Sequence, residues 1–437
     1  MSLSVVARWS CVLLVVVACR EIPTAPVVID AHLSSTELWS GGELRITAAS
    51  FAPPAALPVV ELGADSLVVQ RIDDSTVSAR LPRTAGSFEV RVIQGRGVAL
   101  PGTVHLNGFR DVHDGPPFSG TAYQLVAGGP PILIGYGDSG AAYLDLTFNS
   151  VVPVTPDSIH SPDCGFGVGP TYLPGTWVFS GKTAAGTCLP ARVWSLVPSL
   201  HVVDTVGGLA NSEGWYTMAQ PGPHRWVFDW NNFLYLYDCS GGAPCPGPFT
   251  RDRNGPWATI LSPRADRFVM IPTDQTTVIY DAASMDTAYV DSTFGGVAAA
   301  AFSLDEDTLY LEHSANLVAL HAGDGAPLGL FSFDSLPNTG SLYALATAPD
   351  PVRPLVYAAR EYYDFTVNQW RMELLTIDRT TWRLVGNALV TNDPGLIGNP
   401  VVVVPSPSER LVYVVATYGG FHTRGLRPTI WRFDTPP

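Results

Sequence analysis

Lysine is almost missing from this chain. Lys182 is its only lysine, and Lys plus Arg come to 25 residues against 39 Asp plus Glu, a formal net charge of −14. A protein that binds nucleic acid has to neutralise phosphates with clustered Lys and Arg side chains. The sequence offers no such basic stripe, which excludes nucleic acid as a partner.

Charged residues of every kind are also scarce, at 15% of the chain, whereas hydrophobic residues make up 46%. This balance is too apolar for an intrinsically disordered chain. The 41 glycines and 38 prolines are too many for a helical architecture. A length of 437 residues corresponds to two or three domains, fewer if one is a large β unit. The composition predicts a folded, all-β chain.

Motifs for common catalytic and metal sites are absent. The sequence has no Gly-x-Ser-x-Gly elbow, no His-Glu-x-x-His and no calcium loop. Gly181-Lys182-Thr183 ends like a phosphate-binding loop, but Gly175 lies one position too far upstream and no helical period follows, so we expect a hairpin loop. Asp305-Glu306-Asp307 is typical of a solvated turn, and the nine histidines are scattered. We predict no catalytic residue, no metal site and no cofactor.

The N-terminus has the layout of a secretory signal. Arg8 precedes the apolar run Val12–Val17, which is too short to span a membrane as a helix. Val16-Val17-Ala18-Cys19 resembles a bacterial lipobox, which implies cleavage after residue 18, lipid on Cys19 and a tether over residues 19–26. The residue after Cys19 is Arg20 rather than aspartate, which resembles the pattern of lipoproteins that are sorted to the outer membrane. We expect a cell-envelope lipoprotein, with ordinary secretion as the alternative.

Four further cysteines agree with export: Cys164, Cys188, Cys239 and Cys245. An oxidising compartment favours disulfides, and four cysteines allow three pairings. Cys239 and Cys245 flank a turn short enough to be closed by a bond between them, which leaves Cys164 with Cys188. Zinc is the competing interpretation, although the spacing lacks a Cys-x-x-Cys and nearby histidine.

Residues 27–107 carry the pattern of a small β-sandwich. Short runs that alternate apolar and polar residues, separated by turn residues, predict strands that each bury one face. These runs lie at 44–47, 59–62, 77–81 and 88–92. Gly41–Thr47, Asp74–Pro82 and Ala85–Val92 resemble the IPT/TIG family of immunoglobulin-like domains, with a departure at Ala48, where the family usually has glycine. The resemblance implies a spacer or binding module.

From residue 108 to 437 the pattern has a longer period. Apolar strands that end in an acidic or polar residue recur every 40 to 57 residues, which is the length of a four-stranded propeller blade. These strand ends are Leu144-Asp145, Trp194-Ser195, Tyr237-Asp238, Tyr280-Asp281, Leu320-His321, Ile377-Asp378 and Phe433-Asp434.

The clearest unit predicts strands at 257–260, 267–270, 277–281 and 288–290. Its Ser-Pro-x-x-x-Arg turn and Val-Ile-Tyr-Asp strand end resemble the YVTN/WD40-like propeller repeats. We predict seven blades, with six or eight as alternatives. The last unit stops after its third strand, and residues 104–112 are expected to supply the missing outer strand, because an open edge would otherwise be exposed.

Aromatic residues gather in two segments that we expect to be long loops on one face of adjacent blades, at 360–371 and 417–427. Tyrosine and tryptophan are enriched in recognition surfaces. The alternative is that these rings pack onto their own blades. The candidate binding residues are Tyr362, Tyr363, Phe365, Trp370, Tyr418, Phe421 and His422.

Together these observations favour a non-catalytic, lipid-anchored propeller that binds a protein or a glycan, with the immunoglobulin-like domain as its spacer. The alternative is a propeller hydrolase or lactonase, whose site would be built at the channel mouth from single residues of several blades. Three or more converging acids or histidines would favour the enzyme, and an exposed aromatic patch would favour binding.

Overall fold

The protein is described here by a computed structural model. Its described part is a succession of β-strands, and no α-helix occurs in it, nor any helix that could cross a membrane. The structure describes residues 30–435 except 50, 52–56, 96, 120–130, 138–139, 154–167, 174–175, 183–187, 196–200, 206–214, 231–232, 239–248, 253–255, 263–265, 273–276, 285, 292–298, 314–315, 334–335, 337–339, 349–353, 366–367, 394–400, 407–409 and 417–426.

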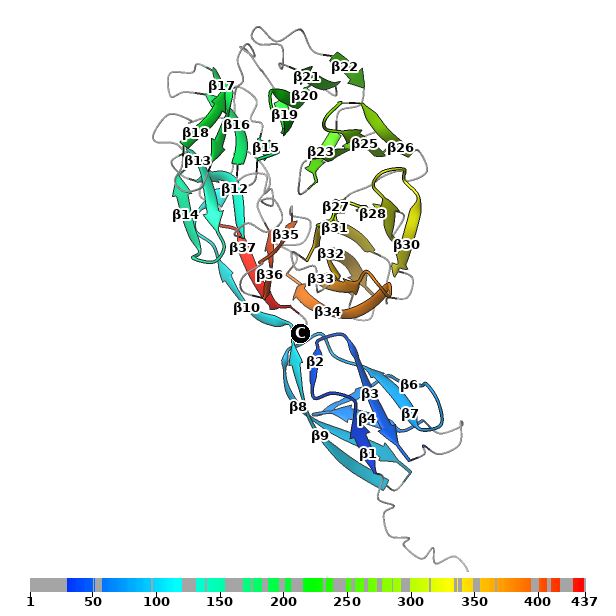
Figure 1. Cartoon of the computed structure of the whole chain (residues 1–437). Helices are drawn as coiled ribbons and strands as arrows, with labels where there is room; N and C mark the ends of the chain where they lie inside the picture. The colour runs from blue at the N-terminus through cyan, green and yellow to red at the C-terminus, as the bar shows by residue number, and fades with distance from the viewer. Residues whose placement is uncertain are drawn as a thin grey trace, which may run out of the picture. The chain divides into compact units, whose positions relative to one another are not determined.

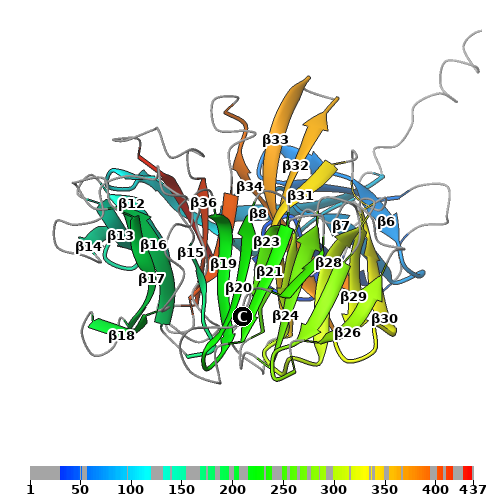
Figure 2. The same ribbon diagram turned by 90° about the horizontal axis from the view of Figure 1, so that it is seen from above.

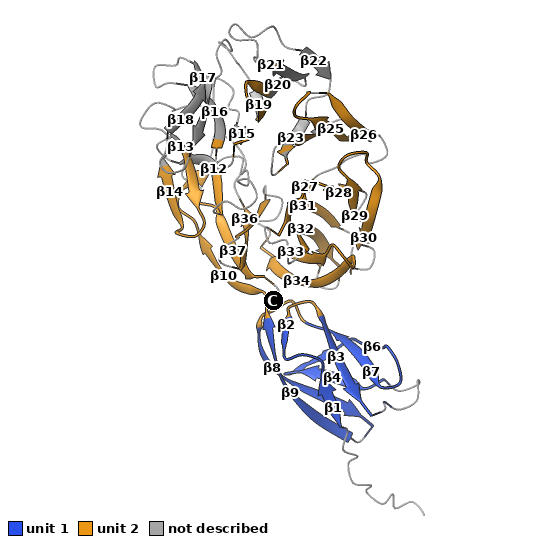
Figure 3. Ribbon diagram, in the orientation of Figure 1, with its two compact units in different colours: residues 1–38, 43–81, 86–106 blue, residues 39–42, 82–85, 107–437 orange. Residues whose placement is uncertain are grey.

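The chain divides into two compact units (Figure 3). The smaller unit comprises residues 1–38, 43–81 and 86–106. The larger unit comprises residues 107–437 together with two short segments, 39–42 and 82–85.

Two antiparallel sheets make up most of the smaller unit. One has the strand order β1 (Ala31–Leu33), β3 (Glu43–Ala48), β7 (Thr76–Arg80) and β6 (Val69–Arg71). The other has the order β2 (Glu37–Trp39), β9 (Gly97–Asn107), β8 (Gly86–Gln94), β4 (Val59–Leu62) and β5 (Asp65–Leu67). The four strands expected from alternation are β3, β4, β7 and β8.

One buried core joins these two sheets. Leu44 and Ile46 of β3 are buried, whereas Glu43 and Arg45 are exposed, as a period of two requires. They belong to the same cluster as Val90 and Val92 of β8 in the other sheet. Each sheet therefore buries one face against its partner.

The larger unit contains seven four-stranded antiparallel sheets among its described residues, arranged around a common centre (Figure 1). Six of them use consecutive strands. Their strands are β11 (Phe118–Ser119), β12 (Ile132–Gly137), β13 (Gly140–Asp145) and β14 (Ser150–Pro153); β15 (Val168–Pro170), β16 (Thr176–Lys182), β17 (Cys188–Ser195) and β18 (His201–Thr205); β19 (Trp215–Gly222), β20 (Arg225–Trp230), β21 (Phe233–Asp238) and β22 (Phe249–Asp252); β23 (Pro256–Leu261), β24 (Arg267–Pro272), β25 (Thr277–Asp281) and β26 (Thr287–Asp291); β27 (Ala300–Phe302), β28 (Thr308–His313), β29 (Asn316–His321) and β30 (Pro327–Ser332); β31 (Gly340–Thr347), β32 (Leu355–Asp364), β33 (Gln369–Asp378) and β34 (Arg383–Thr391).

The remaining sheet joins the two ends of this unit. Its order is β10 (Phe109–Asp114), β37 (Thr429–Asp434), β36 (Leu411–Ala416) and β35 (Val401–Pro405), so that the outer strand comes from the start of the unit. Arg432 of β37 donates to both carboxylate oxygens of Asp111 in β10, and the Nε–Oδ1 distance is 2.6 Å. The expectation that the segment before the first sheet supplies the outer strand is confirmed, but the strand covers Phe109–Asp114, and residues 104–107 of the expected segment belong to β9. This arrangement of sheets is a β-propeller.

Local turn chemistry explains the repeat found in the sequence. All seven predicted strand-end residues are the last residue of the third strand in their sheet. In three of these sheets the strand-end carboxylate accepts backbone N–H groups of the following turn: Asp145 from Thr147, Asp281 from Ser284 and Asp378 from Thr380. The acidic strand ends therefore shape turns.

Candidate binding surface

The hairpin β32–β33 is longer than its counterparts. Each of its strands has ten residues, whereas β28 and β29 have six. The two hairpins share the register at their base, because the first residue of the second strand pairs with the last residue of the third: Thr308 with His321, and Leu355 with Asp378. The four additional residues per strand therefore lie at the turn end and add about 13 Å.

Figure 2 shows β32 and β33 extending beyond the other sheets of the ring. The expectation of a long loop over 360–371 was wrong, because the ladder continues to the pair Asp364–Gln369. Cross-strand pairs between large side chains such as Tyr363 and Trp370 stabilise a sheet. The only connection that remains between the two strands is 365–368.

Three aromatic rings meet at the end of this hairpin, and we call Tyr363, Phe365 and Trp370 the aromatic tip. The Tyr363 ring makes edge contacts with Phe365, at 5.1 Å between centroids, and with Trp370, at 5.4 Å. Its hydroxyl donates to Oδ1 of Asn368 at 2.6 Å. Phe365 is 73% exposed and Trp370 is 50% exposed. The tip therefore presents two large apolar groups to solvent in fixed positions.

The surroundings of the aromatic tip are charge-balanced. Arg371 Nη1 lies 3.2 Å from Oδ2 of Asp364, and these residues flank the tip on the two strands. A partner would consequently meet apolar area at the tip rather than a net charge.

Tyr362 does not belong to this surface, although it was one of the candidate binding residues. Its side chain is fully buried. The Arg83 and Arg360 guanidinium groups lie over its ring, at 5.2 and 5.0 Å from the centroid, and Arg83 also donates to its hydroxyl. For this residue the packing interpretation holds.

Below the tip, the larger unit buries a charged group, Glu373 of β33. Its Oε1 accepts from Arg360 Nη1 at 3.1 Å, and its Oε2 lies 2.8 Å from Arg83 Nη1 and accepts from Asn387 Nδ2 at 2.9 Å. Burial lowers the pKa of Arg360, and the charge of Glu373 opposes that effect. The paired charges and hydrogen bonds offset part of the cost of desolvation, and the net pKa of Arg360 stays below its ordinary value.

Tyr343 of β31 lies beside two buried acids, Glu361 of β32 and Glu312 of β28. Burial, a hydrogen bond with Glu361 and the charges of both acids raise the pKa of Tyr343 to about 12. Glu312 Oε1 also accepts from the Leu342 N–H at 3.1 Å. The raised pKa delays ionisation of this phenol to well above pH 10.

The other candidate residues fall mostly outside the described part of the chain. Cys188 is the first residue of strand β17. No group of three or more His, Cys, Asp or Glu residues that could hold a metal occurs in the described ranges. The candidates that lie outside the described residues are Cys19, Cys164, Cys239, Cys245, Tyr418, Phe421 and His422.

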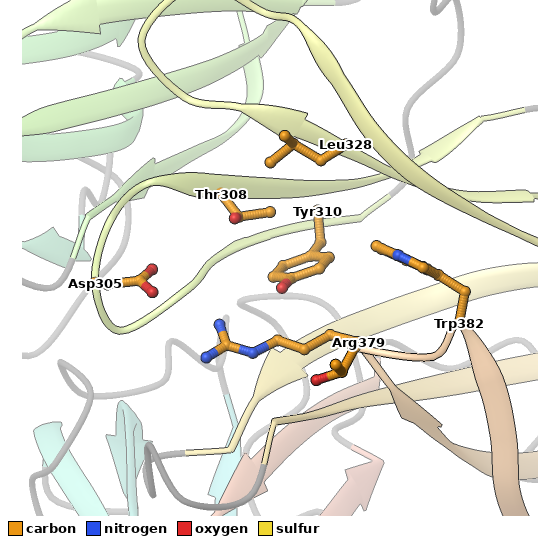
Figure 4. A pocket seen from close by; sticks show the side chains of 7 residues that line it. Asp305, Thr308, Tyr310, Leu328, Arg379 and Trp382 are labelled. Atoms are coloured by element: carbon orange, nitrogen blue, oxygen red, sulfur yellow. The ribbon is translucent and has the colours of Figure 1, made fainter.

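A second feature of the larger unit is a pocket at the opposite end of the β33 strand from the aromatic tip (Figure 4). From the sequence, Asp305 was expected only as part of a solvated turn. The pocket could not be predicted, because its lining residues come from two sheets and share no motif. The only available signal was polar and aromatic residues at the turns of neighbouring repeats.

No protein family model matches the chain, and no curated protein matches it. Among solved structures, the chain is similar to the β-propeller domain of Cps50 (Swd1) from Myceliophteria thermophila, with 12% identity and a TM-score of 0.49 over 74% of this chain and 99% of that one. It is also similar to a chain of a mitotic checkpoint complex, with 11% identity and a TM-score of 0.49 over 75% of this chain and 94% of that one.

Proposed function

We propose that this chain is a protein-binding platform whose main contact is the aromatic tip. The observation that carries the proposal is the pair of exposed rings, Phe365 and Trp370, held by Tyr363 at the end of a hairpin that projects from the ring. Large exposed apolar side chains lower the solubility of a protein, and clusters of them mark interaction sites.

The fixed geometry of the tip favours tight binding. A partner that covers the rings has little side-chain entropy to remove, because Tyr363 contacts both neighbours and its hydroxyl is hydrogen-bonded. Tryptophan and tyrosine are also the residues that most often dominate the binding energy of an interface. The partner surface is expected to be an apolar pocket that accepts Trp370 and Phe365.

Site-specific photo-crosslinking tests this function. A benzophenone amino acid replaces Phe365, and Phe148 serves as the matched control because it is 78% exposed at a turn of another sheet. After irradiation of intact cells, we expect a discrete protein adduct from position 365 that disappears in Trp370→Ser. Equal adducts from positions 365 and 148, or none from 365, would contradict the proposal.

We propose further that the seven sheets are the blades of a seven-bladed propeller over residues 108–437. The strand exchange between β10 and β37 supports this proposal, since it ties the first and last strands of the ring together. The smaller unit would be an immunoglobulin-like domain of the IPT/TIG type over residues 27–107 that acts as a spacer. Its two sheets with one shared core support this part.

A spacer domain separates the propeller from an anchor. We propose that this anchor is a lipid on Cys19 that inserts into the outer membrane. The support is the sequence Val16-Val17-Ala18-Cys19 after an apolar signal. Replacing Cys19 with serine should move the protein from the membrane fraction to the soluble fraction. An unchanged distribution would leave ordinary secretion or another anchor.

A further inference from the structure

A pocket of about 370 Å³ lies between two neighbouring sheets of the larger unit. One wall consists of the first hairpin and the outer strand β30 of the β27–β30 sheet, and the other is the turn between β33 and β34. The volume falls in the lower part of the range for small-molecule sites, about 300–1,000 Å³. The lining residues are Asp305, Thr308, Tyr310, Leu328, Arg379, Thr380 and Trp382 (Figure 4).

The polar part of the pocket combines one negative and one positive side chain. Asp305 is positioned by Ser303 Oγ, which donates to its Oδ1, and by the Asp307 N–H at 3.4 Å. Burial raises the pKa of Asp305, but these hydrogen bonds and the charge of Arg379 lower it further, so that the net pKa is below the ordinary value. Burial raises the pKa of Tyr310, and the neighbouring Arg379 opposes this rise. The pocket therefore places an acceptor beside a donor and has no net charge.

An indole forms the apolar wall. Trp382 occupies the left-handed backbone region, with φ of 53°, and its indole lies directly over Gly329 of β30. A Cβ at position 329 would come within 2.0 Å of the indole Cε2, so glycine is required for this approach. The Tyr310 ring lies 6.2 Å from the indole, and half-exposed Leu328 lines the pocket beside it.

We propose that this pocket binds a neutral sugar residue. Adjacent sugar hydroxyls both donate and accept, which matches an acceptor at Asp305 and donors at Arg379 and Thr308. The C–H face of a sugar ring is apolar and would pack on Trp382. A simple anion would meet the charge of Asp305, and a simple cation would meet that of Arg379. This site is separate from the aromatic tip and does not depend on the role proposed for it.

Saturation-transfer NMR on the full chain tests the proposal, with the methyl glycosides of glucose, galactose and mannose as probes. For a ligand of this size in a preformed pocket, we expect a Kd on the order of 1 mM for at least one of them. Trp382→Ala should weaken binding at least tenfold.

Two conservative variants guard against a fold defect in Trp382→Ala. Asp305→Asn keeps an Oδ1 for the turn and should weaken binding at least fivefold, as should Arg379→Gln. Their matched controls are Asp307→Asn and Arg383→Gln, which change exposed neighbours outside the pocket lining and should shift Kd by less than twofold.

Three results would overturn the proposal. One is no saturation transfer to any of the three glycosides at 10 mM. Another is transfer that persists unchanged in both Asp305→Asn and Trp382→Ala. The third is sodium acetate or glycine binding more tightly than every glycoside in a manner that depends on Arg379, which would identify a site for anions or zwitterions.

Discussion

Two neighbouring sheets of the larger unit share one topology and differ in length. The β27–β30 sheet has strands of three to six residues, and the β31–β34 sheet has strands of eight to ten. The shorter sheet ends near Glu312 and His313. In the longer sheet, the pair Arg360 and Glu373 lies level with that end, and the hairpin continues past it to the aromatic tip.

The difference in strand length shows how the projecting β32–β33 hairpin is held in place. A hairpin that rises above its neighbours loses the packing that adjacent sheets provide. In the β31–β34 sheet, ionic and hydrogen-bond contacts centred on Glu373 hold the base of that hairpin extension. The buried network therefore supports the extension that carries the exposed tip.

The largest effect is expected from Glu373→Gln. The amide cannot compensate Arg360, whose side chain is fully buried, so the free energy of unfolding should fall by about 3–5 kcal/mol. Urea denaturation followed by tryptophan fluorescence reports on the larger unit, since only Trp9 of the eleven tryptophans lies outside it.

Glu312→Gln in the shorter sheet is the matched control for this change. Its amide oxygen can still accept from the Leu342 N–H, so a loss of about 1 kcal/mol is expected. Similar losses for Glu312→Gln and Glu373→Gln would refute the special role of the buried network.

A smaller effect on stability is expected from the ionisation of Tyr343, which lies beside Glu312 of the shorter sheet and Glu361 of the longer one. Its pKa in the folded chain, about 12, is above the ordinary value of 10.0. The unfolded state therefore loses its phenolic proton first, and stability present below pH 10 is lost as the pH rises toward 12.

Tyr343→Phe lacks this proton, so its urea midpoint should fall less than that of the wild type between pH 10 and 12. The reference is the range from pH 7 to 9, where the phenol is protonated in both states and the two proteins should change in parallel. Parallel curves above pH 10 as well would mean that Tyr343 has no perturbed titration.

The smallest effect on stability is expected at the aromatic tip itself. Phe365→Ser removes a ring that is 73% exposed, and the free energy of unfolding should change by no more than about 0.5 kcal/mol. Phe148→Ser, equally exposed at a short turn, should behave alike in the same urea experiment. A loss above about 2 kcal/mol for Phe365→Ser would show that the ring serves packing.

Much of the fold was predictable because its signals are local. Asp378 caps the turn that follows it, and Ser262 and Ser303 each accept the N–H of the residue five positions later, at 3.1 and 3.0 Å. These turn hydrogen bonds join residues within five positions of one another, so the same residue types recur in the sequence wherever the same turn recurs in a sheet. The closing strand was predictable because an unpaired edge in the last sheet had to be covered.

The candidate sites were predictable only in part. Alternation along β32 could not identify Tyr362 as buried, because every residue from Leu355 to Tyr362 is buried and both faces of the strand are covered. The pocket joins Asp305 and Arg379, which lie 74 positions apart in the sequence and on different sheets.

Composition, strand period and turn residues were therefore enough to indicate an all-β chain with a repeating unit, since each depends on neighbours within a few residues. The burial of Glu373 against Arg83, the height of the β32–β33 hairpin and the lining of the pocket required the folded chain. Burial and cavities depend on which distant segments come together, and strand alternation constrains only which side of its own strand a residue faces.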